Sequence, residues 1–366
     1  MKFAGLRIAL IGPLPPPSGG MANQTLQLAR LLEAAGAKIQ LVQVNAPYSP
    51  AWTAKIKGLR AALRLALYLR RLWRVADQVD LFHVMANSGW SWHLFAAPAI
   101  WLARIRGKRV IVNYRGGEAD HFFCRQHRLV ALSLNRADAI IVPSVFLADV
   151  FERYGFATEI VPNIIDLSHF SPGALDRTAR TGPVLLVARN LEAIYDNASA
   201  LRAFAIVKDA CPGARLVIAG SGSELSALKQ LAQQLGMAAS VQFTGRVDNL
   251  AMATLYRNCD LVLNPSLADN MPISILEALA CAIPVVSTSV GGIPVLLQHD
   301  VTGLLVAPGD SQAMAQAALS LLQAPVRARS IGAAGFAFVQ QFSWDQVAPQ
   351  LLAQYRRVLN AAARET

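Results

Sequence analysis

Two carboxylates stand eight positions apart in the segment 269–280, on either side of the start of a predicted helix. The preceding segment, 260–266, is apolar like a buried strand and runs into a turn. Pro272 suits a first helical position, and the apolar residues after it continue at helical spacing. We therefore expect Asp269 on a loop and Glu277 about two turns into the helix.

The backbone between these acids is suited to an anion. The N–H groups of Met271, Ile273 and Ser274 have no partner inside the predicted helix, and the helix dipole points its positive end at the same place. An anion site between two carboxylates suits the diphosphate of a sugar nucleotide. The simpler alternative is a strand–turn–helix unit in which Asp269 only caps the helix and Glu277 is solvated.

Length and composition indicate a protein of two domains. The chain has 366 residues, of which 54% are apolar and 16% charged, and domains average about 150 residues. The four cysteines are far apart, without a Cys-x-x-Cys pair or a histidine at metal-ligand spacing, so we expect reduced thiols. We expect no signal peptide, because the amino-terminal apolar run is too short. No window reaches about 18 unbroken apolar residues, so we expect a cytoplasmic protein.

The net charge of +11 is uneven. Residues 1–180 hold 22 Lys/Arg against 11 Asp/Glu, whereas residues 181–366 hold 12 of each. Much of the excess falls in the segment 55–74, where helical spacing gathers cations on one side and leucines on the other. Such a helix fits an anionic membrane surface, or is a core helix with a solvated basic face. Nucleic acid is a weaker interpretation, because no stacking pattern or recognition motif accompanies the cations.

Strand-like and helix-like segments alternate throughout, which predicts an α/β fold of parallel sheets with crossover helices. The predicted strands are 7–11, 39–44, 81–84, 110–113, 139–142, 159–161, 184–188, 215–219, 241–243, 260–264 and 285–287. We expect domains at 1–170 and 184–343 with a linker at 171–183, within the polar stretch 168–183, and a helix at 344–366 that packs back on the first domain.

Ligands of such sheets bind at the carboxyl ends of the strands, and the candidate site residues fall there. Gly19 and Gly20 lie between the first strand and a helix expected to start near Asn23, where bare backbone suits close approach of a phosphate or sugar, although glycine turns before helices are also common for steric reasons. Arg189 ends the first strand of the second half, where it suits charge-assisted bonds to a diphosphate. Its alternative is a surface ion pair with Glu192.

Taken together, these segments resemble the retaining glycosyltransferases of the GT-B fold, family 4, and the resemblance spans nearly the whole chain. Order and spacing carry it rather than any single motif. The similar stretches are 19–21, 137–144, 161–166, Arg189, 243–245, 264–266, 269–277, 290–294 and 300–306. The resemblance implies two doubly wound Rossmann-like domains facing a central cleft.

The resemblance also implies roles for residues. Asp269 matches the first acid of the family's paired-acid motif, near the donor sugar, and Glu277 the second, at the ribose hydroxyls. Arg189 matches the diphosphate-binding arginine, and Gly20 the residue of the first domain that approaches the phosphates. Asp269, Arg189 and Glu277 are the expected catalytic residues. The other expected donor contacts are Gly19, Thr244, Gly245, Arg246, Asn270, Met271, Pro272, Ile273 and Ser274.

The chain departs from the family's pattern at several positions. Asp269 stands where glutamate is usual, and Asn270 replaces a common glycine. The phosphate-binding lysine expected after Arg189 is missing, with Tyr195 or Arg246 as the nearest substitutes. The histidine usual after a middle strand of the first domain is also missing, and Arg115 and His121 are the nearest candidates.

The resemblance implies front-face transfer of a sugar with retention, in which the leaving diphosphate helps to deprotonate the acceptor. No cofactor and no metal are expected. The expected partners are a nucleotide sugar, a glycan or polyprenyl-linked acceptor in bacterial cell-surface polysaccharide biosynthesis, and possible contact of residues 55–74 with the inner face of the membrane. The alternatives are a catalytically silent sugar-nucleotide-binding partner and a GT-B epimerase. A dinucleotide oxidoreductase is disfavoured, because the glycine spacing is wrong and Asn45 and Ala46 stand where an acid would follow the second strand.

Overall fold

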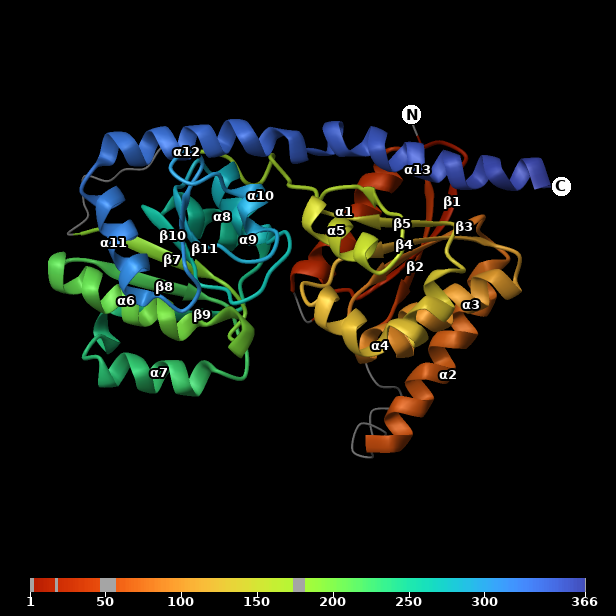
Figure 1. Cartoon of the computed structure of the whole chain (residues 1–366), viewed down its shortest axis with the longest axis horizontal. Helices are drawn as coiled ribbons and strands as arrows, with labels where there is room; N and C mark the ends of the chain where they lie inside the picture. Colours follow the sequence, from red (N-terminus) through yellow and green to blue (C-terminus); the bar gives the residue numbers. More distant parts are fainter. Residues whose placement is uncertain (1–2, 17–18, 47–56, 174–181, 366) are drawn as a thin grey trace. The chain divides into compact units, whose positions relative to one another are not determined.

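The computed structural model describes residues 3–16, 19–46, 57–173 and 182–365, and these form two units. Unit 1 comprises Met1–Ile164 and Trp344–Thr366, and unit 2 comprises Ile165–Ser343. In each unit a sheet lies between helices on its two faces (Figure 1). The α/β expectation is confirmed.

Unit 1 is built on six parallel strands in the order β2-β1-β3-β4-β5-β6. The strands are β1 (Arg7–Gly12), β2 (Lys38–Gln43), β3 (Leu81–Ala86), β4 (Arg109–Tyr114), β5 (Ala139–Val142) and β6 (Glu159–Ile160). Every residue of β3 is buried, as expected of a parallel strand covered on both faces.

Two apolar clusters attach the helices of unit 1 to its sheet. Helices α2 (Lys57–Ala76), α3 (Ala97–Ile105), α4 (Ala119–Leu134) and α5 (Val145–Arg153) share one cluster. Helices α1 (Gly20–Ala34) and α13 (Trp344–Glu365) share the other, in which Tyr355 and Val358 of α13 are buried. Helix α13 therefore packs on the sheet of unit 1.

Unit 2 repeats the plan with six parallel strands in the order β12-β11-β10-β7-β8-β9. The strands are β7 (Val184–Ala188), β8 (Arg215–Ala219), β9 (Val241–Gly245), β10 (Leu261–Asn264), β11 (Val285–Thr288) and β12 (Leu304–Val306). The helices are α6 (Asn197–Ala210), α7 (Leu225–Gln234), α8 (Asn249–Arg257), α9 (Ile273–Ala280), α10 (Ile293–Leu296), α11 (Ser311–Leu322) and α12 (Pro325–Val339). Helices α6, α7 and α11 pack in one apolar cluster, and α8, α9 and α10 in another.

Some sequence expectations need correction. Ile165 and Phe170 are buried in a core cluster of unit 2, so unit 1 ends at Ile164 rather than at 170. Most of the expected linker, residues 174–181, lies outside the described residues. Strand β12 was not among the expected strands, because its three residues are too few to show a period.

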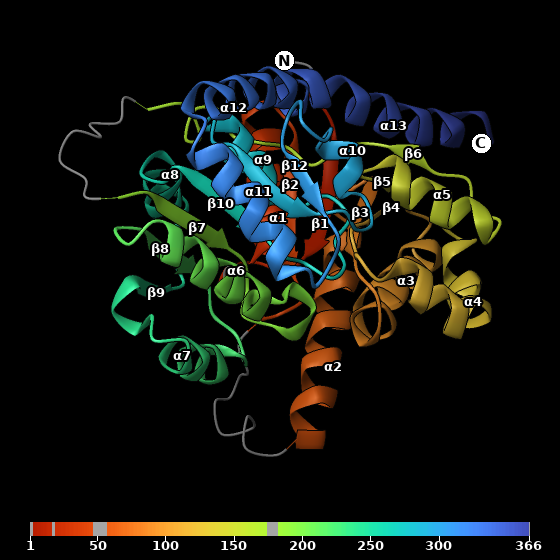
Figure 2. The ribbon, with the colours of Figure 1, turned by 60° about the vertical axis from the view of Figure 1, so that its left-hand side comes forward.

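Helix α2 is described from Lys57, so Lys55 and Ile56 of the expected basic segment lie outside the described residues. Its amino-terminal end projects beyond the sheet of unit 1 (Figure 2). Trp73 is 48% exposed rather than packed in the core, and the Arg106 guanidinium lies over its ring at 4.2 Å. Within the described parts of the chain, no helix is both long and apolar enough to span a bilayer.

Candidate functional site

The candidate site is built on the carboxyl ends of β7 and β10, which are neighbours in the sheet of unit 2. Arg189 follows β7 directly, and Asp269 lies in the loop between β10 and α9. The Arg189 Nη2 atom donates to the Asp269 carboxylate, and Nη1 donates to Ser274 Oγ at 3.1 Å. The two paired side chains are only 9% and 16% exposed. Arg189 is therefore paired across the sheet with Asp269 and not with Glu192, whose carboxylate accepts from Ser223 at 2.9 Å.

Tyr195 completes the setting of Arg189. It ends a short helical turn, Ala193–Tyr195, after β7, and the Arg189 guanidinium lies over its ring at 4.1 Å, a cation–π contact. The Arg189 Nε atom is buried and has no hydrogen-bond partner. The guanidinium is thus held on three sides while one of its donors remains unused.

Glu277 lies on helix α9, about one turn after Ser274. Helix α9 begins at Ile273, with Pro272 as its N-cap, so Glu277 is in the second turn and not two turns in. The Tyr256 hydroxyl donates to Glu277 Oε2 at 3.0 Å and also lies 3.0 Å from the Ser274 carbonyl. Burial raises the pKa of Glu277 to about 7, against the opposing effects of the Tyr256 hydrogen bond and the Arg189 charge.

These contacts exclude the simpler interpretation of the paired acids. Glu277 is hydrogen-bonded and partly buried rather than solvated. Asp269 does not cap the helix: its Oδ1 accepts from the neighbouring Asn270 N–H at 2.8 Å, and its Oδ2 from Arg189. Met271 is buried in a core cluster, so only its backbone faces the helix start. The N–H groups of Ile273 and Ser274 lack partners within the helix, as in any first turn.

Glycines allow the neighbouring loops to pack on this segment. A Cβ atom on Gly291 would lie 1.9 Å from the Asp269 carbonyl oxygen, and one on Gly292 would lie 2.1 Å from that of Asn270. Gly292 N–H also donates to the Asp269 carbonyl at 3.1 Å. On the other side, a Cβ on Gly220 would lie 2.0 Å from the Arg189 carbonyl oxygen. Both charged residues are therefore positioned by direct backbone-to-backbone packing.

Three of the expected donor contacts, Thr244, Gly245 and Arg246, lie at the carboxyl end of β9 and directly after it. Thr244 Oγ1 donates to the Gly245 carbonyl at 3.1 Å, and that carbonyl also accepts from Gly220 N–H at 2.9 Å. Arg246 is exposed and its Nε donates to Ser221 Oγ at 2.6 Å. Arg246, which follows β9, is thus bonded to the loop after β8. Of the two substitutes expected for the missing lysine, Tyr195 is the one that contacts Arg189.

The remaining candidates belong to unit 1. Helix α1 begins at Gly20 and not near Asn23, with Gly19 as its N-cap. A Cβ on either glycine would meet nothing within 4 Å, so packing within unit 1 does not require glycine there. His121 is exposed on α4, and Arg115 follows β4 in a polar network.

Sequence reasoning missed Tyr256 and Ser221. Tyr256 is fully buried on α8, and its helical spacing predicts only a core position. Its contact with Glu277 joins two helices, which no local pattern reveals. Ser221 is one of many loop serines, and only the packing of the β8 and β9 loops brings it to Arg246.

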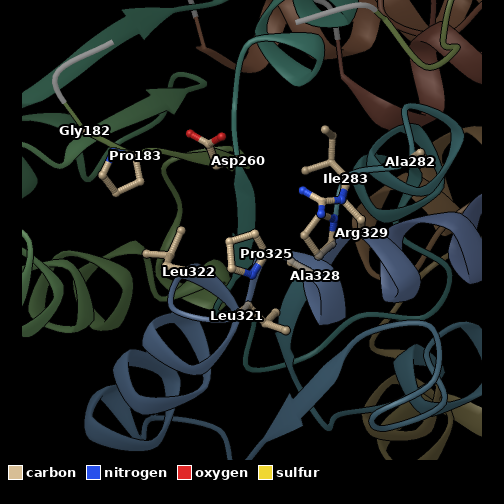
Figure 3. A pocket seen from close by; sticks show the side chains of 11 residues that line it. Gly182, Pro183, Asp260, Ala282, Ile283, Leu321, Leu322, Pro325, Ala328 and Arg329 are labelled. Carbon is tan, nitrogen blue, oxygen red and sulfur yellow. The ribbon is translucent and has the colours of Figure 1, made fainter. Parts of the chain in front are cut away.

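Two further observations concern possible metal ligands and a second concave region in unit 2. In the described residues no three His, Cys, Asp or Glu side chains cluster in a way that would hold a metal. A pocket of about 300 Å³ does occur in unit 2, lined by Pro183, Asp260, Ile283, Pro325 and Arg329 among others (Figure 3). It lies at the amino ends of β7 and β10, opposite the paired acids, whereas ligands of parallel sheets bind at the carboxyl ends.

Comparison with known families agrees with this geometry. Residues 18–169 match the family model described as Glycosyltransferase Family 4, and residues 182–324 match the model described as Glycosyl transferases group 1. Together the two matches cover most of both units. The chain belongs to this glycosyltransferase family.

Curated relatives of this chain match over part of their length. The D-inositol 3-phosphate glycosyltransferase of Mycolicibacterium paratuberculosis is 37% identical over 216 residues, which are 57% of this chain and 49% of the relative. The enzyme of the same name from Segniliparus rotundus is 35% identical over 217 residues, 56% of this chain and 48% of the relative. The chain thus spans about half the length of the curated relatives it matches.

Solved structures share the fold over nearly the whole chain. Sucrose-phosphate synthase from Thermosynechococcus elongatus has a TM-score of 0.80 at 21% identity, covering 97% of this chain and 100% of its own. The Anabaena HepE protein in complex with UDP-glucose has a TM-score of 0.77 at 19% identity, covering 96% and 99%. At these identities the likeness establishes the fold, which is the expected GT-B fold.

Proposed function

We propose that this protein transfers a sugar from a nucleotide diphosphate to a glycan or lipid-linked glycan, with retention of configuration and without a metal ion. The transfer would serve cell-surface polysaccharide biosynthesis on the cytoplasmic side of the membrane. UDP is the first nucleotide to consider, because structures of the similarly folded HepE protein hold UDP and UDP-glucose.

One observation carries the proposal: the Arg189 guanidinium is held between Asp269, Ser274 and Tyr195 beside the start of α9. A departing nucleotide diphosphate needs its negative charge neutralised. A fixed guanidinium provides that charge, and the free N–H groups at the start of α9 add backbone donors. Family membership supports the same assignment.

The acids have separate roles in this proposal. Without ligand, Asp269 neutralises Arg189; a bound diphosphate takes over bonds to the guanidinium, and the Asp269 carboxylate then faces the donor sugar. Glu277, held by Tyr256, accepts hydrogen bonds from the ribose hydroxyls once ionised. No protein nucleophile is required, because in front-face transfer the leaving diphosphate accepts the acceptor's proton.

The test is calorimetric titration of the full chain with UDP, GDP, ADP and dTDP in EDTA, comparing wild type with Arg189→Ala and Glu277→Ala. We expect one nucleotide to bind and each substitution to weaken it by about 10–100-fold, the loss of one charge-assisted contact. Arg202→Ala, an exposed arginine on α6, is the matched control. If no nucleotide binds, the proposal is wrong. If binding requires a divalent ion, the proposed metal independence is wrong.

Turnover separates transfer from the alternatives. The missing lysine after Arg189 favours a silent sugar-nucleotide-binding partner as the second candidate. Such a partner would bind the sugar nucleotide without cleaving it, whereas a transferase also transfers the sugar slowly to water and so frees the nucleotide diphosphate. An epimerase would form its product with no acceptor present.

A further inference from the structure

Arg115 occupies a ligand-binding position in the sheet of unit 1. It is the first residue after β4, an interior strand, and its N–H donates to the Ala86 carbonyl at the end of β3 at 3.0 Å. Ligands of doubly wound sheets bind at this carboxyl edge. The backbone thus fixes Arg115 where the unit's own ligand would lie.

Among the described residues, neutral amide oxygens alone accept hydrogen bonds from the Arg115 guanidinium. Its Nε donates to Asn113 Oδ1 at 3.0 Å, and its Nη1 donates to Asn163 Oδ1 and lies 3.4 Å from Gln24 Oε1. The three amide side chains are 1%, 6% and 6% exposed respectively. The Nη2 atom takes no part in these bonds. Within the described residues, no carboxylate is bonded to or ion-paired with this cation.

A second row of buried groups fixes the orientation of Asn113. Because Asn113 Oδ1 accepts from Arg115, its Nδ2 is the atom that donates to His83 Nε2 at 3.0 Å. His83 Nδ1 must then carry the proton and donate to the Tyr355 hydroxyl of α13 at 2.7 Å. Burial lowers the pKa of His83 to about 3, so the ring stays neutral. The chain Tyr355–His83–Asn113 adds rigidity to Arg115 without adding negative charge.

Burying the Arg115 charge carries a desolvation penalty, which a bound anion would offset. A partly buried charge that neutral groups solvate still lacks a counter-charge. Burial lowers the pKa of Arg115 to about 10, which leaves it charged at neutral pH. A purely structural residue at the centre of these amides would not need a charge. A binding residue would, because guanidinium is suited to phosphate and carboxylate oxygens.

We propose that Arg115 is the subsite for an oxyanion, such as a phosphate, carried by the acceptor. The anion would bond to Nη2 of Arg115 at the carboxyl edge of the unit 1 sheet. The inference rests on the proposed transferase function, because it assigns the acceptor to unit 1. Two sources of the oxyanion are possible, a soluble polyol phosphate and a lipid-linked phosphate.

The first test uses the wild-type chain with saturating UDP, so that the site on unit 2 is filled. Phenylglyoxal modification of individual arginines is followed by mass spectrometry, with inorganic phosphate added at constant ionic strength. We expect phosphate to slow modification of Arg115 by about tenfold, the effect of one charge-assisted contact. Arg153, which is 60% exposed on α5, is the internal control and should be unaffected. Equal rates at Arg115 with and without phosphate would overturn the inference.

The second test compares variants. Arg115→Gln should weaken inorganic phosphate binding by about tenfold or more, while Arg115→Lys, which keeps the charge, should retain most of it. Arg153→Gln should behave as wild type. UDP affinity is measured in the same samples and reports both the fold and the donor site. Nucleotide binding with no effect of phosphate at Arg115 refutes this inference alone, whereas the absence of binding by all four nucleotides to wild type refutes the proposed function.

A comparison of probes identifies the source of the oxyanion. D-inositol 3-phosphate, which the names of the curated relatives suggest, represents a soluble acceptor, and farnesyl phosphate a lipid-linked one. Inositol without phosphate is the control. Arg115 should be protected by one phosphorylated probe at a concentration about tenfold lower than by the other, and equal protection by unphosphorylated inositol would contradict an anion subsite.

Discussion

At the scale of single residues, the contact between Arg189 and Asp269 joins two of the expected site residues. Asp269 is one methylene shorter than the usual glutamate, yet its carboxylate reaches Arg189 directly. The acid therefore neutralises the guanidinium before any ligand arrives. A bound diphosphate must compete with it.

This competition predicts opposite effects of Asp269→Asn on two measurements. Nucleotide diphosphate should bind more tightly, by about threefold to tenfold, because Arg189 is no longer neutralised. The free energy of unfolding without nucleotide should fall by about 1–3 kcal/mol, because the buried Arg189 charge has lost its partner. Calorimetry and urea unfolding measure the two effects, with Glu192→Gln as the control. Weaker binding in Asp269→Asn would show that the acid supports the nucleotide rather than competing with it.

Glu277 predicts a pH dependence of stability. Its pKa is about 7 in the folded chain, raised by burial from 4.5, so the folded state holds a proton that the unfolded state releases. The stabilisation is complete below about pH 4.5 and is lost as pH rises through about 7. Wild type should therefore lose up to about 3 kcal/mol between pH 5 and pH 8 that Glu277→Gln retains. Urea unfolding across this range checks it, and parallel profiles of the two proteins would contradict it.

At the scale of elements, the site depends on loops that pack backbone against backbone. Gly292 shows this well, because its φ of −87° is open to any residue and only the Asn270 carbonyl excludes a side chain. The requirement for glycine is therefore steric. The loop after β11 thereby holds the loop that carries Asp269.

We predict that Gly292→Ala destabilises the chain by about 1–3 kcal/mol, the usual cost of overpacking, and lowers nucleotide affinity because the displaced Asn270 carbonyl shifts the backbone donors at the start of α9. Gly20→Ala is the matched control for stability alone, because a Cβ there meets nothing within 4 Å and alanine favours the helix that begins there; Arg202→Ala is the control for nucleotide affinity. Circular dichroism melts and UDP titration give the two readouts. Equal stability of the two variants would mean that the Asn270 loop yields freely.

At the scale of the whole molecule, charge divides between the units. Residues 1–164 and 344–366 hold 23 Lys/Arg against 11 Asp/Glu, whereas residues 165–343 hold 11 against 12. Exposed Arg70 and Arg74 lie on α2 beside the half-exposed Trp73. Cations around an exposed tryptophan are typical of surfaces that bind the membrane interface.

We predict that the full chain binds vesicles containing anionic lipid and that salt weakens the binding. The double variant Arg70→Gln/Arg74→Gln should bind about thirtyfold less, since each of the two cations near the surface contributes about 1 kcal/mol. Arg202→Gln/Lys229→Gln, two exposed cations of unit 2, is the matched control. Sedimentation with vesicles measures both, and equal loss in the two double variants would contradict a docking role for α2.

Local patterns revealed much of this architecture. Five of the expected strands, including 81–84 and 110–113, lie inside observed strands that extend one or two residues further at an end, because buried parallel strands are continuous apolar runs. The alternation of strands and helices predicted two α/β units. The loop position of Asp269 and the helical position of Glu277 also followed from sequence, through the turn and the apolar stripe around them.

What the sequence alone determined is therefore which segments are strands, which are helices, and which polar residues end them. The tertiary structure determined which of these residues contact one another. Arg189 and Asp269 are 80 positions apart, and they pair because β7 and β10 are neighbours in the sheet, an order that periodicity does not encode. Tyr355 joins Arg115's network through His83 because α13 returns to unit 1. Periodicity reports the face of each element, whereas long-range partners depend on how the elements pack.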